Sequence, residues 1–377
     1  MYRYLFVIAL LWAFVGCSNP KSDSNKYLLY IGTYTDEGSK GIYVSEFDTA
    51  QGKLLEPKLA AKITNPSFQY ITKDGSLLWS VSEAEDGTGL VRGFDLNKTT
   101  GELKSLSSFA TGGIGPCYVS MDETKNIVMA ANYKSGNVFI IPVDENGTAT
   151  GKGFNHQHTG KGPNLNRQED PHAHSIRVGP DSKYVYSADL GTDKIYVYAV
   201  DHNQLNLYTE LSIAPGSGPR HIDFHPGKKA MAVVNELKGT VTLFKPDNTG
   251  CFSQYYSTTS TLPPDFDDFN KCADVHFSPD GKFLYASNRG HNSIVIFKVN
   301  QETMDLETVG WQQETIVWPR NFTIAPSGNY LLVANKDANT ITVFTVNKKN
   351  GILTYTGNSI EVSKPVCLNL IKIEKKL

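Results

Sequence analysis

The sequence predicts an all-β protein, a seven-bladed β-propeller, and three observations lead to this prediction. A pattern of Pro, an alternating strand, a turn of the Pro-Asp-Gly type, a second strand and Asn occurs six times. The interval from the Pro-equivalent to the Asn-equivalent is 16 residues in every copy. A third strand and a looser fourth segment follow each copy, giving a period of 46–57 residues. Four-stranded units that repeat at this period are typical of propeller blades.

The six copies share one register, and a single copy could not bury both faces of its sheet. Neighbouring copies must therefore pack on each other. The Pro- and Asn-equivalents form the pairs Pro66/Ser82, Pro116/Asn132, Ala173/Asp189, Pro219/Asn235, Cys272/Asn288 and Pro319/Asn335.

The two ends of the chain supply the seventh blade. Residues 27–35 (YLLYIGTYT) and 41–47 (GIYVSEF) are similar to the second and third strands of a blade, and no first strand precedes them. Residues 364–373 (KPVCLNLIKI) are similar to a first strand, and nothing follows them. We expect 364–373 to form the innermost strand of the N-terminal blade, which would close the ring and leave few free sheet edges.

The composition allows a large core and argues against nucleic acid as a partner. With 377 residues, of which 40% are apolar, the chain can bury a large core. The formal net charge of −2 provides no basic field for nucleic acid.

The N-terminus is predicted to be a targeting segment. It carries one Arg and an apolar run from Tyr4 to Val15, which is shorter than the ~20 residues of a membrane-spanning helix. The sequence from Phe14 to Cys17 is similar to a bacterial lipobox. We therefore expect a lipoprotein signal peptide at 1–16, lipidation at Cys17, a tether at 17–26 and the propeller at 27–377. The protein would be an exported lipoprotein of the periplasm or outer membrane that meets the membrane only through this anchor. An ordinary secretory signal, and plain secretion, is the alternative.

The other cysteines show no metal-ligand spacing, and we expect buried free thiols. They are Cys117, Cys251, Cys272 and Cys367.

The shared register identifies the residues that surround one mouth of the central channel. The residue after each Pro-equivalent opens the innermost strand, and the residue after each Asn-equivalent ends the antiparallel second strand at the same side. The first ring is Val366, Ser67, Cys117, His174, Arg220, Ala273 and Arg320. The second ring is Tyr34, Glu83, Tyr133, Leu190, Glu236, Arg289 and Lys336.

Charged residues gather in these rings on blades four to seven. His174, Arg220, Glu236, Arg289 and Arg320 converge on one rim, where such charges need a ligand or each other. The alternative to a ligand site is a network of salt bridges between blades. The arginines outnumber the carboxylates, and a guanidinium suits bidentate binding of phosphate or carboxylate, so we expect a small anionic ligand.

A cluster of histidines in the sequence is a candidate metal site. His156, His158, His172 and His174 lie within 19 residues. Zinc and iron sites usually add acidic or thiolate partners at a readable spacing, and none is evident here. We therefore predict no metal. His225 and His276 are expected to be satisfied core residues, and His221 to point away from Arg220 across its strand.

Common catalytic motifs are missing. The sequence contains no GxSxG nucleophile elbow, no P-loop and no dinucleotide fingerprint. Acyl-enzyme chemistry on a serine therefore has no support.

Several segments resemble a known family. GKGPNLNRQEDPHAHS, GSGPRHIDFHP, VVNEL, YASNRGHNSI and WPRNFTI are similar to segments of the seven-bladed propeller lactonases. The best-known members are 6-phosphogluconolactonases, and the family also includes fungal carboxy-cis,cis-muconate lactonising enzymes. The resemblance extends from about Tyr27 to Ile373.

The resemblance, combined with the register, implies a set of site residues. The implied catalytic residues are His174, Glu236, Arg220 and Arg289. The implied substrate-binding residues are Arg320, Arg167, Gln168, His172, Lys336 and Tyr133.

The expected activity is hydrolysis of an anionic sugar lactone by water, without metal or organic cofactor. His174 or Glu236 would act as general base, and the arginines would stabilise the oxyanion and hold the anionic group. Two alternatives stay open: a lyase or isomerase acting on a muconolactone-type acid, and a non-catalytic envelope propeller that binds anionic sugars or another protein. Export is unexpected for an enzyme of a cytosolic pathway, so the physiological lactone is not specified.

Overall fold

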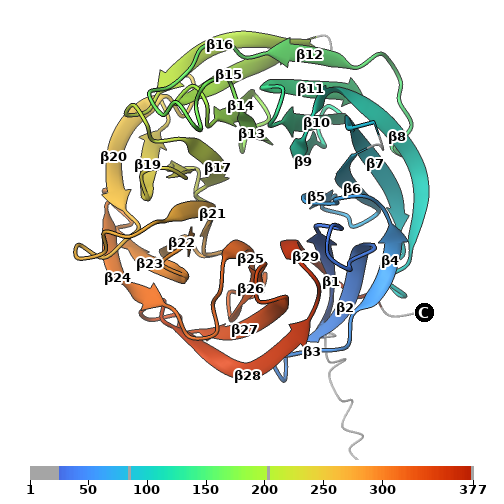
Figure 1. Ribbon diagram of the computed structural model, residues 1–377, viewed down its shortest axis with the longest axis vertical. Helices are drawn as coiled ribbons and strands as arrows, with labels where there is room; N and C mark the ends of the chain where they lie inside the picture. The colour runs from blue at the N-terminus through green and yellow to red at the C-terminus, as the bar shows by residue number, and fades with distance from the viewer. Residues whose placement is uncertain (1–24, 84–85, 202–203, 375–377) are drawn as a thin grey trace, which may run out of the picture.

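The computed structural model describes residues 25–83, 86–201 and 204–374. These residues form seven antiparallel sheets arranged as blades around a central axis, and no helix occurs among them (Figure 1). The described residues therefore include no helix that could span a membrane. The predicted seven-bladed propeller is confirmed.

Each blade has its first strand nearest the axis and its last strand at the outside. Blade 2 contains β5 (Gln69–Ile71), β6 (Leu77–Glu83), β7 (Thr88–Leu96) and β8 (Leu103–Ile114). Blade 3 contains β9 (Pro116–Asp122), β10 (Ile127–Asn132), β11 (Asn137–Pro142) and β12 (Phe154–Gln157). Blade 4 contains β13 (Ala173–Val178), β14 (Tyr184–Asp189), β15 (Lys194–Asp201) and β16 (Gln204–Ser212). Blade 5 contains β17 (Pro219–Phe224), β18 (Met231–Asn235), β19 (Thr240–Lys245) and β20 (Gln254–Ser260). Blade 6 contains β21 (Lys271–Phe277), β22 (Phe283–Arg289), β23 (Ser293–Val299) and β24 (Leu306–Gln312). Blade 7 contains β25 (Pro319–Ile324), β26 (Tyr330–Asn335), β27 (Thr340–Val346) and β28 (Leu353–Glu361).

Both ends of the chain build blade 1, as the sequence predicts. Its strands are β29 (Pro365–Lys372), β1 (Lys26–Thr33), β2 (Gly41–Asp48), β3 (Lys53–Leu54) and β4 (Lys58–Lys62). The innermost strand β29 pairs with β1 from Tyr27↔Lys372 to Thr33↔Pro365, and Figure 1 shows the last strand of the chain lying beside the first. β1 begins one residue before the expected domain boundary at Tyr27. The predicted signal peptide, Cys17 and most of the predicted tether lie outside the described residues.

The repeated Pro and Asn positions face each other across the first two strands. In blades 3 to 7 the predicted pairs are direct cross-strand partners, for example Pro219↔Asn235 and Pro319↔Asn335. In blades 5 and 7 the buried Asn amide ties the end of the second strand to the third strand. Asn335 Nδ2, for instance, donates to Thr342 Oγ1 at 3.1 Å. Asn235 Nδ2 makes the equivalent bond to Thr242 Oγ1 at 2.9 Å, whereas Asn132 and Asn288 donate to Thr111 O and Thr261 O of the preceding blade.

Adjacent blades share their apolar cores. Seven clusters of buried side chains are present among the described residues, and each lies between two neighbouring sheets. One cluster joins blades 7 and 1 around Leu332 and Leu368. The four cysteines of the propeller are free thiols. Cys251, Cys272 and Cys367 are buried and Cys117 is partly exposed.

A bulge recurs at the start of the innermost strand. In six blades the pairing register shifts by one directly after the Pro-equivalent. A bulge leaves one residue without a cross-strand partner and turns its side chain, and bulges are frequent next to active sites. The shift falls at or beside the first-ring residues Cys117, His174, Arg220, Ala273, Arg320 and Val366.

Candidate active site

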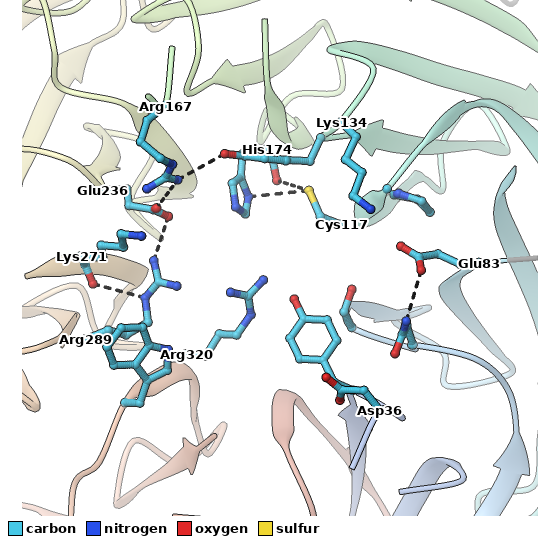
Figure 2. Close-up of a pocket in the computed structure, with 17 residues that line it drawn as sticks. Asp36, Glu83, Cys117, Lys134, Arg167, His174, Glu236, Lys271, Arg289 and Arg320 are labelled. Atoms are coloured by element: carbon cyan, nitrogen blue, oxygen red, sulfur yellow. Dashed lines mark hydrogen bonds and ion pairs between the residues drawn. The ribbon is translucent and has the colours of Figure 1, made fainter. Parts of the chain in front are cut away.

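A cavity of about 500 Å³ lies at the end of the channel where the innermost strands begin. The side chains that surround it in Figure 2 come from all seven blades or their loops. Nine of the fourteen ring positions identified from the sequence line it. They are Tyr34, Ser67, Glu83, Cys117, Tyr133, His174, Glu236, Arg289 and Arg320.

The cavity also contains residues that the sequence reasoning missed. Three of them come one residue before a Pro-equivalent of the repeat: Lys271, Asn65 and Trp318. A fourth, Lys134, follows the second-ring residue Tyr133. Asp36 lies two residues beyond Tyr34. Extending the first ring back by two residues and the second ring forward by one would have found four of these five.

Glu236 forms ion pairs with three arginines at the positively charged side of the cavity. Its Oε1 accepts a hydrogen bond from Arg167 Nη2 at 2.7 Å, and its Oε2 accepts from Arg220 Nε at 3.0 Å and Arg289 Nη2 at 2.8 Å. Burial alone would raise the pKa of Glu236, but the charges of Arg289 and Arg220 hold this pKa well below its usual range. Guanidinium donors occupy both oxygens of this carboxylate, so it is a poor proton acceptor for a water in the cavity. Glu236 is therefore an anchor for arginines.

Arg220 lies beneath Glu236. Its side chain is 1% exposed, and the residues that line the cavity in the described structure do not include it. It donates to Glu236 through Nε and to the carbonyl of Ala273 through Nη1. Burial and the neighbouring charges of Arg289 and Arg320 lower the pKa of Arg220 to about 9, which leaves it charged at neutral pH. Arg220 thus supports the cavity from below.

Other cations of the cavity have groups free to bind a ligand. Among the described residues, the guanidinium of Arg320 has no hydrogen-bond or ion-pair partner; it lies 5.1 Å from the centre of the Tyr34 ring and points into the cavity (Figure 2). Arg167 carries a buried Nη1 atom that lacks a hydrogen-bond partner. Lys134 and Lys271 also line the cavity and add positive charge. Unpaired buried donors are costly unless a ligand completes them.

His174 combines burial with access to the cavity. Its ring is 5.3 Å from the Tyr133 ring, and its Nδ1 is 3.7 Å from Cys117 Sγ. Burial and the nearby positive charge of Arg220 lower the pKa of His174 well below its ordinary value. The imidazole is therefore neutral at pH 7 and can accept a proton.

The opposite wall of the cavity is acidic. Asp36 and Glu83, from blades 1 and 2, lie across the cavity from the arginines in Figure 2. Glu83 Oε2 accepts a hydrogen bond from Asn65 Nδ2 at 3.2 Å. The site is therefore polarised, with five cations on blades 3, 4, 6 and 7 and two carboxylates facing them.

Trp318 marks local backbone strain at the rim. Its φ of 50° lies in the left-handed region, which is unfavourable for a bulky residue. Its backbone N–H donates to Asn292 Oδ1 at 2.8 Å, and its ring lies 5.7 Å from the Arg289 guanidinium. Such outliers persist where the surroundings enforce them, often at functional sites.

Three of the implied substrate-binding residues do not line the cavity in the described structure. Gln168 Nε2 donates to Leu190 O and Asp193 Oδ1, both at 2.8 Å, so Gln168 fixes the loop that carries Arg167. His172 stacks on Tyr133 with ring centres 4.5 Å apart. Lys336 pairs with Asp337 at 2.6 Å.

The loop histidines serve separate structural contacts. His158 is buried between Asp189, at 2.7 Å from its Nδ1, and Tyr198, at 2.9 Å from its Nε2. His156 lies against the Tyr198 ring. Within the described part of the chain, no group of three or more His, Cys, Asp or Glu side chains is arranged to hold a metal ion.

The expected core histidines have polar partners, but His221 differs from its prediction. His225 Nε2 is 3.2 Å from Gly281 O, and His276 Nε2 is 3.0 Å from Asp274 Oδ2. His221 does not point away from Arg220, because its Nε2 is 3.2 Å from Arg220 Nη1. The register shift between Pro219 and Ile222 breaks the alternation on which the prediction rested.

Comparison with known proteins places this geometry in a family. The family model for seven-bladed β-propeller lactonases matches residues 28–370. A 6-phosphogluconolactonase of Bacillus subtilis is 39% identical over 92% of this chain and 99% of its own length. A 6-phosphogluconolactonase of Formosa agariphila is 34% identical over 78% of this chain and 86% of its own length. The periplasmic gluconolactonase of Pseudomonas aeruginosa has a TM-score of 0.87 and 29% identity, with 93% of this chain and 100% of that chain covered. The chain belongs to the seven-bladed β-propeller lactonase family.

Proposed function

We propose that the protein is a lactone hydrolase of the 6-phosphogluconolactonase type, which opens a small lactone that carries an anionic group. The observation that carries this proposal is that a neutral His174 and a guanidinium without a partner, that of Arg320, line the same cavity. The names of the relatives support lactone hydrolysis. The surplus of cations over carboxylates supports an anionic substrate.

In the proposed reaction His174 is the general base. Its Nδ1 faces Cys117, and Nε2 has no hydrogen-bond partner among the described residues, so Nε2 is the nitrogen available to a water molecule. The water oxygen bonds to the lactone carbonyl carbon while its proton passes to His174. The bond between this carbon and the ring oxygen then breaks, and the ring oxygen takes the proton back. A positioned general base typically contributes about 10²–10⁴-fold to the rate.

Arginine groups stabilise the negative charge that develops on the carbonyl oxygen. The candidates are the free Nη1 of Arg167 and the guanidinium of Arg289, because Glu236 holds both in place. Preorganised donors of this kind need no rearrangement during the reaction. Arg320 and Lys134 remain to hold the anionic group of the substrate at the centre of the cavity.

The proposal is tested by proton release on fresh 6-phosphogluconolactone and on gluconolactone, each compared with its spontaneous rate. We expect acceleration by the wild-type protein and a higher kcat/KM for the phosphorylated lactone. Arg320→Gln should lower kcat/KM by roughly tenfold or more for the phosphorylated lactone, because it loses a charge-assisted contact, and much less for gluconolactone. Acceleration of neither lactone would refute the hydrolase.

A lyase or isomerase would give a different product, so the product should be identified by mass. Hydrolysis adds one water to the lactone, whereas isomerisation leaves the mass unchanged. A product without added water would move the assignment to the muconolactone-type chemistry that the same family contains.

We also propose that the protein is exported and lipidated at Cys17. The apolar run before Phe14-Val15-Gly16-Cys17 supports this, as does the similarity to a periplasmic gluconolactonase. Cells fed a labelled fatty acid should incorporate the label into the wild-type protein and not into Cys17→Ser. Equal labelling of the two would contradict the anchor.

A further inference from the structure

A line of hydrogen-bonded, buried polar side chains continues from Glu236 below the cavity. Arg220 Nη1 is 3.2 Å from His221 Nε2, and His221 Nδ1 is 2.7 Å from Asp274 Oδ1. Arg220, His221 and Asp274 are all at most 5% exposed. The line therefore runs from Glu236 on blade 5 to Asp274 on blade 6, and of its four members only Glu236 lines the cavity in the described structure.

The chemistry of the two neighbours fixes the tautomer of His221. Arg220 can only donate hydrogen bonds, so His221 Nε2 must offer its lone pair. Ionised Asp274 can only accept, so His221 Nδ1 must carry the proton. A neutral imidazole with its proton on Nδ1 satisfies both contacts at once. Burial and the charge of Arg220 lower the pKa of His221 to about 4, in agreement with a neutral ring.

The far end of the line is held rigidly. Asp274 Oδ2 accepts from His276 Nε2 at 3.0 Å and from Asn321 Nδ2 at 2.6 Å. Asn321 lies on β25, so blade 7 also fixes this carboxylate. Asp274 is thus an immobile acceptor, which is what is needed to orient a histidine ring.

Aromatic rings confine His221 laterally. Its ring centre lies 5.5 Å from Phe68, 5.3 Å from Tyr118 and 5.5 Å from His174. Phe68 and Tyr118 stack on each other at 4.0 Å. The imidazole is therefore fixed both in plane, by Asp274, and in position, by packing.

We propose that His221 and Asp274 are positioning residues of the active site. Asp274 fixes the tautomer and orientation of His221, and the lone pair on His221 Nε2 fixes the Arg220 guanidinium. Arg220 in turn holds Glu236, which holds Arg289 and Arg167 at the cavity. The catalytic arginines are therefore preorganised from a carboxylate on the next blade, although neither His221 nor Asp274 touches the substrate.

Two substitutions at His221 separate this role from simple packing. His221→Phe keeps a flat ring among Phe68 and Tyr118 but removes the acceptor for Arg220. His221→Gln offers an amide oxygen near the position of Nε2. We expect kcat for 6-phosphogluconolactone to fall roughly 10²-fold in the Phe variant, because small misplacements of catalytic groups have effects of this size. The Gln variant should recover at least a tenth of the wild-type kcat.

KM provides a second readout in the same experiment. Arg320 is not part of the line, so substrate capture should persist and KM should change less than about threefold in both variants. Wild-type kcat in His221→Phe would overturn the proposal. So would an equal loss in both variants when their thermal unfolding matches that of the wild type.

A nuclear magnetic resonance measurement tests the inference without relying on the proposed function, on which the kinetic arm rests. With ¹⁵N-labelled histidine, and the signal assigned by its loss in His221→Gln, wild-type His221 should show a protonated Nδ1 and an unprotonated Nε2 at pH 7. A proton on Nε2, or an imidazolium, would overturn the proposal even if the protein is an active lactonase. Conversely, a protein that hydrolyses no lactone but shows this tautomer would refute only the hydrolase.

Discussion

Residues of one type have different roles in this site because they differ in the number of partners. Arg220 and Arg320 occupy equivalent ring positions on blades 5 and 7. Arg220 is bonded to Glu236, His221 and Ala273, whereas Arg320 has no hydrogen-bond or ion-pair partner among the described residues. A guanidinium whose donors are used is a support, and one whose donors are free is a binding group. The partner count, rather than the residue type, assigns the roles.

The pH dependence of catalysis should identify the base. The folded pKa of His174 lies well below 6.5, so the active neutral form is present above that pKa and is lost only as the pH falls through it. We expect kcat/KM to stay constant from pH 7 down to about 6 and to decline only at lower pH. Initial rates measured from pH 4.5 to 7.5 check this. An acid limb centred at or above 6.5 would contradict the assignment.

The matched controls for this profile are His174→Ala and Glu236→Gln. The first should lower kcat by roughly 10²–10⁴-fold and abolish the acid limb. The second should retain the limb while reducing activity, because Glu236 orients arginines and does not accept the proton. Loss of the limb in Glu236→Gln with its retention in His174→Ala would exchange the two roles.

At the scale of the strand, one recurring bulge creates the site. The ordinary alternation of a strand would send neighbouring residues to opposite faces. The register shift after the Pro-equivalent falls at His174, Arg220 and Arg320, and the side chains of Arg220 and His221 lie in contact there. The regularly paired part of each inner strand anchors it to the second strand. The bulged end of the strand carries the side chains of the site.

The buried Asn at or beside the end of the second strand in blades 3, 5, 6 and 7 should contribute strongly to stability. Asn288 is fully buried; its Nδ2 donates to Thr261 O at 2.9 Å and its Oδ1 accepts from Thr261 Oγ1 at 2.8 Å. Asn288→Ala would remove both of these buried hydrogen bonds, at a cost of about 1–3 kcal/mol in the free energy of unfolding. Urea denaturation measures the loss. The exposed Asn329→Ala is the control and should change this free energy by less than about 0.5 kcal/mol.

The repeat made the strands and rings predictable from the sequence, because the Pro–Asn interval fixes which residues share a level. Nine ring residues consequently line the cavity as expected. The bulge could not be predicted, since it depends on cross-strand pairing, and so His221 was placed on the wrong side. Nor could sequence distinguish Arg220 from Arg320, because burial beneath Glu236 is a tertiary property. Lys134 and Lys271 were missed because only one residue per strand end was considered.

At the scale of the molecule, stability depends on ring closure. Each of the seven core clusters needs two blades, and the cluster between blades 7 and 1 includes Leu368 of β29. In repeat architectures each unit is stabilised through its neighbours, so one incomplete blade weakens two interfaces.

Removal of β29 should therefore destabilise the whole propeller. A chain ending at Ser363 loses Leu368 and the pairing with β1. We expect it to bind a hydrophobic dye and to lose the cooperative unfolding transition of the full chain in urea. A chain ending at Glu374 is the control, because it retains β29. Indistinguishable transitions for the two truncations would show that closure by the C-terminus is dispensable.

The pairing of β1 with β29 also sets an order of events during synthesis. About 330 residues separate the two strands, so the inner edge of one of the first strands made waits for the last strand to leave the ribosome. At typical elongation rates of 5–20 residues per second this wait lasts roughly 15–65 s. Throughout it β1 presents unpaired backbone groups, the feature that makes nascent chains vulnerable to association. Any factor that shields this edge of β1 must therefore act until β29 has been made.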